Sequence, residues 1–131
     1  MSLSFERVPL AQVPWEELDH RPDRTVHQTR EWTSFLAATQ RAEPVVLRAR
    51  RDGEPVAWFT GAVARRAGVR ILGSPMRGWA TSHMGFNVDP GVEDLDLVEL
   101  TGALAAHASG ALGCWHLEVM DRRFADGWRP P

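Results

Sequence analysis

The chain has 131 residues, 44% of them hydrophobic, and a formal net charge of −2. This is enough sequence for a single packed domain, 1–131, and its apolar content excludes a disordered tail. The near-neutral charge balance gives no argument for a polyanionic partner. No stretch is long and apolar enough for a membrane span, and Cys114 is the only cysteine, so we expect a soluble, cytoplasmic protein.

Two residue types that carry much enzyme chemistry are absent. All fifteen basic residues are arginine, and the sequence contains neither lysine nor tyrosine. Without lysine there is no Schiff base and no phosphate-binding P-loop lysine. Without tyrosine no phenol can serve as a general acid.

The first third of the chain predicts a strand followed by two helices. Phe5 to Val8 is typical of a short strand, and Pro14 to Leu18 of a brief helix, because proline suits a first helical turn. Thr29 is a suitable N-cap, and the apolar residues after it recur at helical spacing. We therefore predict a second helix from Arg30 to Gln40.

Three strands joined by tight turns are predicted next. Their ranges are Pro44 to Arg50, Pro55 to Arg65 and Val69 to Leu72. Asp52-Gly53 is a strong two-residue hairpin signal, and Ala67-Gly68 marks a second turn, so the strands should form an antiparallel meander. In the middle strand, alternation places five side chains on one face: Val56, Trp58, Thr60, Ala62 and Ala64.

The last third predicts a strand, a helix and a strand. Met84 to Val88 could be a short strand, and apolar spacing indicates a helix from about Asp94 to Ser109, with Gly110 as its stop. Cys114 to Met120 is apolar on both faces except for His116 and Glu118, as a central strand would be. Because it follows a helix, we expect it to run parallel to a neighbour. The predicted class is α/β, with a mixed, mostly antiparallel sheet flanked by helices.

A loop rich in glycine and polar residues stands out between these elements. Ile71 to Phe86 reads ILGSPMRGWATSHMGF, and such loops are frequently functional. Arg77 could meet a carboxylate or phosphate, and Trp79 could stack on a substrate. Alternatively the loop packs over the sheet edge, with Trp79 and Phe86 filling the core. The candidate substrate-binding residues are Ser74, Arg77, Trp79, Thr81, Ser82 and His83.

The last predicted strand carries Cys114, His116 and Glu118 on one face. These types suit general acid–base catalysis or a metal site. Residues two apart on a strand are about 6.5–7 Å from each other, so a Cys–His nucleophile pair is not required. Three ligands in one straight strand cannot easily surround an ion, so we expect no metal. We favour a partly buried polar row, with Glu118 near an acceptor amine.

The remaining polar residues have plainer interpretations. We expect the run Asp121-Arg122-Arg123 to be a solvated strand end. Arg48, Arg50 and Arg51 could form a basic edge, but no aromatic residues are interleaved as nucleic-acid binding would require. Three histidines without a partner at ligand spacing are expected to be exposed: His20, His27 and His107.

Three runs resemble a known superfamily: QTREWTSFLAATQRAEPVVLRARRDGEPVAWFTG, RILGSPMRGWATSHMGF and GCWHLEVMDRRF. Together with the element order, they are similar to the Gcn5-related N-acetyltransferase (GNAT) superfamily, in its FemAB-like branch, over roughly Phe5 to Phe124. The resemblance implies an N-acetyl- or aminoacyltransferase that uses acetyl-CoA or an aminoacyl donor such as aminoacyl-tRNA. The implied acceptor is a small-molecule or peptidoglycan-precursor-like amine.

FemAB-like proteins have two lobes, and this chain resembles the first, so the fold should be incomplete at its C-terminus relative to the family. Asp89, Glu93, Asp94 and Asp96 crowd the start of the predicted helix, where carboxylates repel a diphosphate. We therefore assign no cofactor-binding residues and expect an acceptor-recognition lobe, in which Glu118 or a water deprotonates the amine.

Two alternatives to a catalytic domain stay open. The chain could be a non-catalytic substrate-binding lobe. It could also be a truncated fragment that needs a second lobe or a partner, with an unpaired sheet edge that invites dimerisation.

Overall fold

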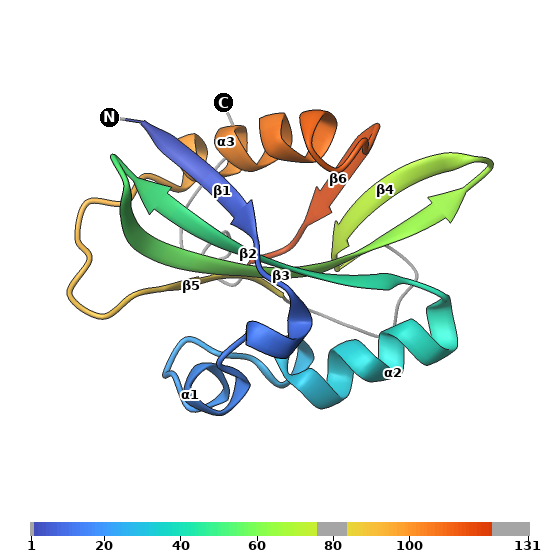
Figure 1. The fold of residues 1–131 in the computed structure, drawn as a ribbon, viewed down its shortest axis with the longest axis horizontal. Coiled ribbons are helices and arrows are strands. Elements are labelled where there is room, and N and C mark those ends of the chain that lie inside the picture. Colours follow the sequence, from blue (N-terminus) through green and yellow to red (C-terminus); the bar gives the residue numbers. More distant parts are fainter. Residues whose placement is uncertain (1, 76–83, 122–131) are drawn as a thin grey trace.

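The computed structural model describes residues 2–75 and 84–121. A six-stranded sheet in the order β1-β2-β3-β4-β6, with β5 paired to β3, forms the middle layer. Helix α3 covers one face, and α1 and α2 lie on the other (Figure 1). The elements are β1 (Leu3–Arg7), η1 (Leu10–Gln12), α1 (Trp15–Asp19), η2 (Val26–Gln28), α2 (Arg30–Gln40), β2 (Glu43–Arg51), β3 (Glu54–Arg66), β4 (Val69–Ser74), β5 (Gly85–Val88), α3 (Leu97–Gly110) and β6 (His116–Val119).

The predicted fold class is confirmed. Every strand pair is antiparallel except β4 with β6, which is parallel. The meander β2-β3-β4 turns at Asp52-Gly53 and Ala67-Gly68, where all four residues have positive φ. Successive left-handed residues are what a two-residue hairpin requires, since their twist matches that of the strands.

Strand β3 contains an irregularity that the alternation pattern did not predict. Its register with β2 shifts beside Ala49 and Arg50, so that Val56 has no direct partner. A bulge of this kind changes the side to which a residue points. Val56 consequently packs with Phe59 in the core beneath α3 rather than with Trp58 on the other face.

The helix boundaries follow from their caps. Helix α2 has the predicted limits, and Oγ1 of Thr29 accepts a hydrogen bond from the amide of Trp32 at 3.3 Å. Helix α3 begins later than predicted because Asp94 has a left-handed φ of 58°. Asp96 then caps the helix, its Oδ1 accepting from the amide of Val98 at 2.8 Å. Gly110 is the last helical residue rather than the stop.

Strands β4 and β5 lie end to end along one side of β3. Ala62 of β3 pairs with Gly73 of β4, and Thr60 pairs with Gly85 of β5. The end of β4 and the start of β5 therefore lie at nearly the same place along β3.

The prediction of a central last strand was wrong. Among the described strands β6 lies at the edge of the sheet, next to β4. His116 is exposed, and the other three residues of β6 are partly buried. Its apolar residues belong to one face, where Leu117 and Val119 pack against the core beneath α3. The other side chains, His116 and Glu118, face the opposite way, so the pattern was that of a one-sided edge strand.

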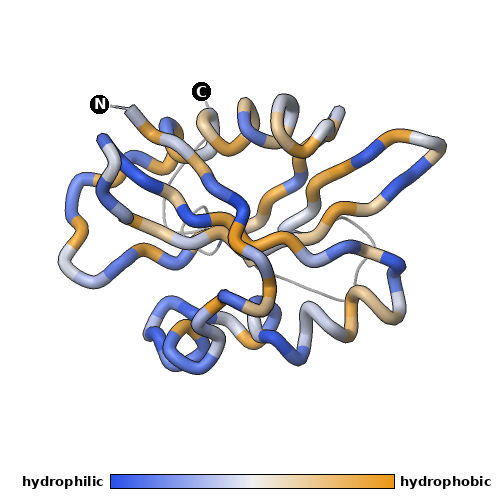
Figure 2. The backbone as a smooth tube through the Cα atoms, viewed as in Figure 1, coloured by the Kyte–Doolittle hydropathy of each residue, from blue (hydrophilic) through white to orange (hydrophobic). Residues whose placement is uncertain are grey.

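The core divides into clusters on the two faces of the sheet. Beneath α3, the rings of Phe59 and Phe86 lie 5.3 Å apart and pack with Leu100 and Leu104. On the opposite face, α2 covers one smaller cluster through Leu36, and α1 covers another. Figure 2 shows the hydrophobic residues concentrated along the central strands. None of the helices in the described ranges combines the length and apolarity needed to cross a bilayer.

We expect Gly85→Ala to lower the free energy of unfolding by about 3 kcal/mol. Gly85 has a φ of +91°, and a Cβ atom there would collide with the carboxylate of Asp121. Gly91→Ala is the matched control, because Gly91 has a φ of +82° but open space around it. It should cost only about 1 kcal/mol of strain. Equal losses in urea unfolding would show that the Asp121 contact does not matter.

Candidate functional site

Of the six residues predicted to bind substrate, the structure describes Ser74. The other five, Arg77, Trp79, Thr81, Ser82 and His83, lie outside the described residues. Ser74 ends β4 and is fully buried. Its hydroxyl donates to the carbonyl of Thr60 at 2.5 Å and accepts from the amide of Gly85 at 2.8 Å. Ser74 thus joins the end of β4 to β3 and to the start of β5.

The end of β6 closes this junction from the other side. The amide of Met120 donates to the carbonyl of Ser74, and the amide of Met84 donates to the carbonyl of Met120, both at 3.0 Å. Asp121 then accepts from the amide of Phe86 at 2.7 Å. The expectation that Asp121 is solvated was wrong, because its side chain replaces a strand partner for β5 and is 1% exposed.

Glu118 stands beside this junction on β6. It is in register with Gly73 of β4. Its Oε1 lies 3.5 Å from Nε2 of His116, and the two side chains are 29% and 58% exposed. A half-exposed carboxylate can bind an ammonium group or accept a proton from an amine. The side chain of Glu118 is therefore only partly covered by the described residues.

Cys114 does not share this row. It is buried in the α3 core, its Sγ lies 3.8 Å from the carbonyl oxygen of Leu112, and burial raises the pKa of its thiol. A thiol held protonated is a poor nucleophile and a poor metal ligand. In the described ranges no three His, Cys, Asp or Glu side chains are grouped as a metal site.

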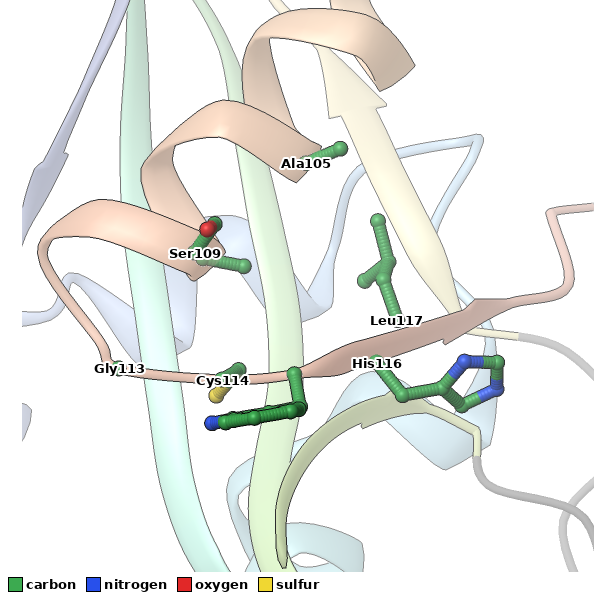
Figure 3. Close-up of a pocket in the computed structure, with 8 residues that line it drawn as sticks. Ala105, Ser109, Gly113, Cys114, His116 and Leu117 are labelled. Atoms are coloured by element: carbon green, nitrogen blue, oxygen red, sulfur yellow. The ribbon is translucent and has the colours of Figure 1, made fainter.

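A hollow of about 390 Å³ lies between α3 and the start of β6 (Figure 3). Leu117 points toward Ala105 of α3, whereas His116 points the other way. The walls are mostly small or apolar, and comprise Ala105, Ala108, Ser109, Gly113, Cys114, Trp115, His116 and Leu117. A larger, open hollow of about 760 Å³ borders η1 and α1 near Trp15, His20 and Arg30.

The sequence analysis missed a buried polar network between the segment before α2 and the sheet. The Arg24 side chain is 2% exposed. Its Nη1 donates to Oδ1 of Asn87 at 2.8 Å and to Oγ1 of Thr60 at 3.2 Å, while Nε donates to Asp19 at 3.0 Å. Burial lowers the pKa of Arg24, although the negative charge of Asp19 acts to raise it. Arg24 therefore anchors a segment with little regular structure.

The rest of this network satisfies backbone groups around β5. Nδ2 of Asn87 donates to the carbonyl of Asp23 at 2.9 Å, and Oδ2 of Asp23 accepts from the amide of Val88 at 2.8 Å. Nε2 of Gln28 donates to the carbonyl of Gly85 at 3.3 Å. Asparagine is unfavourable in strands, so Asn87 within the predicted strand was the signal that could have found the network.

Asp89 forms a second charged cluster at the end of β5. Its Oδ1 accepts from Arg21 and from Arg48, each at 2.8 Å. The guanidinium of Arg48 also lies 4.5 Å from the ring centre of Trp58. The predicted basic edge is therefore wrong for Arg48, whose charge is neutralised and stacked inside the fold.

The histidines differ from one another. His20 is exposed, as predicted. His27 is half-buried against Trp32, with ring centres 4.8 Å apart. His107 packs against Phe5, and its Nε2 is buried with no hydrogen-bond partner in the described part of the chain. Burial lowers the pKa of His107, so the prediction of an exposed histidine there was wrong.

Comparison with protein-family models, with curated proteins and with solved structures finds no match to this chain.

We expect Arg24→Met to lower the free energy of unfolding by about 3 kcal/mol, because Asp19 and Asn87 would lose their buried partner. Arg30→Met removes an exposed arginine from α2 and should change stability by less than about 0.5 kcal/mol. Urea unfolding at pH 7 measures both. A near-neutral Arg24→Met would mean that the network does not anchor the segment.

Asp89 should make stability depend on pH. Burial acts to raise the pKa of Asp89, but hydrogen bonds and charge from Arg48 and Arg21 outweigh it, so the pKa lies below its ordinary value. The carboxylate thus contributes stability above a pH of about 4, and this is lost as the pH falls through the lowered pKa. Asp89→Asn should cost about 2 kcal/mol at pH 7.

Unfolding curves between pH 7 and pH 3 test this. The difference between wild type and Asp89→Asn should shrink as the pH falls, whereas Glu93→Gln, an exposed control, should track wild type. A difference that is constant with pH contradicts the assignment.

Proposed function

We propose that this chain is an acyltransferase-type domain of the GNAT superfamily, FemAB-like, that recognises the amine acceptor. The observation that carries the proposal is the parallel pair of β4 and β6, joined through α3 in an otherwise antiparallel sheet. The sequence resemblance described above implies the same order of elements. The resemblance supplies the proposed chemistry, because a fold by itself does not identify a reaction.

The acceptor side of the proposed site is centred on Glu118. The carboxylate is partly exposed beside Gly73, close to where β4 ends. It would hold the acceptor as an ammonium ion and accept a proton when the amine becomes a nucleophile. The loop residues from Arg77 to His83 lie outside the described residues and remain predicted acceptor contacts.

The acyl donor does not fit the start of α3. An exposed diphosphate needs free amides and little negative charge at a helix N-terminus. The carboxylate of Asp96 already accepts from the amide of Val98, and Glu99 lies in the first turn. No step through coenzyme A is therefore part of the proposal.

The carboxylates at the start of α3 also favour the second candidate, a non-catalytic recognition lobe. Such a lobe would bind the amine through Glu118 and leave donor binding to another lobe or partner. The two candidates differ in whether this chain binds acetyl-CoA by itself.

Calorimetric titration separates them. A stem pentapeptide of peptidoglycan with a free side-chain amine should bind saturably, and acetylation of that amine should abolish binding. Glu118→Gln should weaken binding by roughly tenfold through loss of a charge-assisted hydrogen bond. Glu54→Gln, which removes an exposed carboxylate at the β2–β3 turn, should have no effect.

The same instrument tests the donor. Saturable binding of acetyl-CoA, followed by acetylation of the peptide, would favour a catalytic domain. Acetyl-CoA binding absent up to millimolar concentration would leave the recognition lobe. If neither peptide amines nor small polyamines bind, or if Glu118→Gln binds as wild type does, the proposed acceptor role is rejected.

A further inference from the structure

Two arginines lie directly opposite each other beside the β3–β4 turn. In the antiparallel register, Arg65 of β3 is the partner of Arg70 of β4. The next pair on the same face, Val63 with Leu72, belongs to the cluster beneath α3, so both arginines are on the α3 face of the sheet. Side chains in such a pair have Cβ atoms about 5 Å apart, and like charges there are destabilising.

Among the described residues, no carboxylate forms an ion pair with Arg65 or Arg70. Glu43 is in register with Val63 on the neighbouring strand, but it is already paired with Arg7 at 2.9 Å. Paired cations that cost stability and have no counter-ion in the fold break a rule of sheet stability, and such violations are typical of functional sites.

The surroundings of Arg70 orient its guanidinium without neutralising the pair. Arg70 is half-buried, and its Nε donates to the carbonyl of Leu112 at 3.1 Å, which uses one of five N–H donors. Leu112 follows the end of α3, where the helix dipole is equivalent to about half a negative charge. Cys114 adds no charge, because burial raises the pKa of its thiol although Arg70 acts to lower it. More than one positive charge therefore remains.

An exposed aromatic ring lies next to the pair. The amide of Trp115 donates to the carbonyl of Arg70 at 2.9 Å, so the two residues are neighbours on adjacent segments. Trp115 is 86% exposed. An indole beside guanidinium groups can pack against the organic part of a ligand whose anionic group the arginines hold.

The charge of the pair selects the class of ligand. A carboxylate or a phosphate diester carries one negative charge, whereas a phosphate monoester carries about −1.5 to −2 at pH 7. Guanidinium groups bind phosphate oxygens through two parallel hydrogen bonds. One phosphate monoester can therefore neutralise both arginines, and one carboxylate cannot.

We propose that Arg65 and Arg70 bind the phosphate group of a small phosphate monoester, with Trp115 packing against its organic part. The proposal does not depend on the proposed function, which concerns Glu118. A nucleic-acid chain or a membrane presents many phosphates, whereas these two arginines converge on one point, so the occupant is a small ligand.

Calorimetric titration of the 131-residue protein with phenyl phosphate tests the proposal. Binding should be saturable with a dissociation constant on the order of 1 millimolar or lower. Benzoate, which carries one charge on a similar ring, should bind at least roughly tenfold more weakly. Inorganic phosphate should also bind more weakly, because it has no ring to contact Trp115. In Trp115→Ala, phenyl phosphate should bind no better than inorganic phosphate.

Substitutions test the two arginines. Arg65→Gln and Arg70→Gln should each weaken phenyl phosphate binding roughly tenfold through loss of charge-assisted hydrogen bonds. Arg66→Gln is the matched control, since it removes the same charge from the same turn. Arg66 is in register with Val69, a pair that alternation places on the face of α2. Its substitution should change the affinity less than twofold, and circular dichroism shows whether each variant is folded.

Stability gives a second readout. Arg65→Glu places a carboxylate opposite Arg70, so the midpoint of urea unfolding should rise while phenyl phosphate binding is lost. A pair with only a structural role would respond in the opposite way, with a fall in the midpoint.

Four outcomes overturn the proposal. The first is no saturable binding of phenyl phosphate at millimolar concentration. The second is benzoate that binds as tightly, and the third is Arg66→Gln that weakens binding as much as Arg65→Gln does. The fourth is tighter binding to vesicles that contain phosphatidic acid, or to a single-stranded oligonucleotide, than to phenyl phosphate, which would assign the arginines to a surface or a polymer.

Discussion

The burial of Arg24 is the constraint on which the helical layer and the site both depend. A guanidinium that is 2% exposed is stable only when its donors are paired, and Asp19, Asn87, Thr60 and the carbonyl of Gln28 pair them. These partners come from α1, β5, β3 and η2. The segment around Arg24 therefore cannot move without unpairing a charge, and β5 is held against β3 by the same bonds.

The position of β5 in turn defines the site. With β5 end to end with β4, the glycine-rich loop starts and finishes at one point of the sheet, where Ser74 and Asp121 bind the amides of Gly85 and Phe86. These bonds make the junction of β4, β5 and the end of β6 a well-bonded frame. Glu118 belongs to β6, the strand that completes this frame. Its carboxylate is partly exposed, whereas the side chains of Ser74 and Asp121 are buried.

Strand β6 combines two roles in four residues. Its edge pairs with β4, and Met120 just after the strand closes the junction around Ser74. Its side chains divide into an apolar row toward α3 and the polar pair His116 and Glu118 on the opposite face. The proposed acceptor site uses that polar pair.

Local patterns in the sequence determined the fold class, the limits of α2 and both hairpins, because N-caps and left-handed turn residues act within a few positions. Tertiary structure decided the rest. Whether Asp121 meets water or an amide of β5, whether Val56 follows the alternation, and whether β6 is central or at the edge all depend on strand pairing between distant segments. Arg24 and Asn87 are 63 positions apart, so no local pattern links them. Their pairing exists only because the fold buries both, and a buried charge has to find a partner.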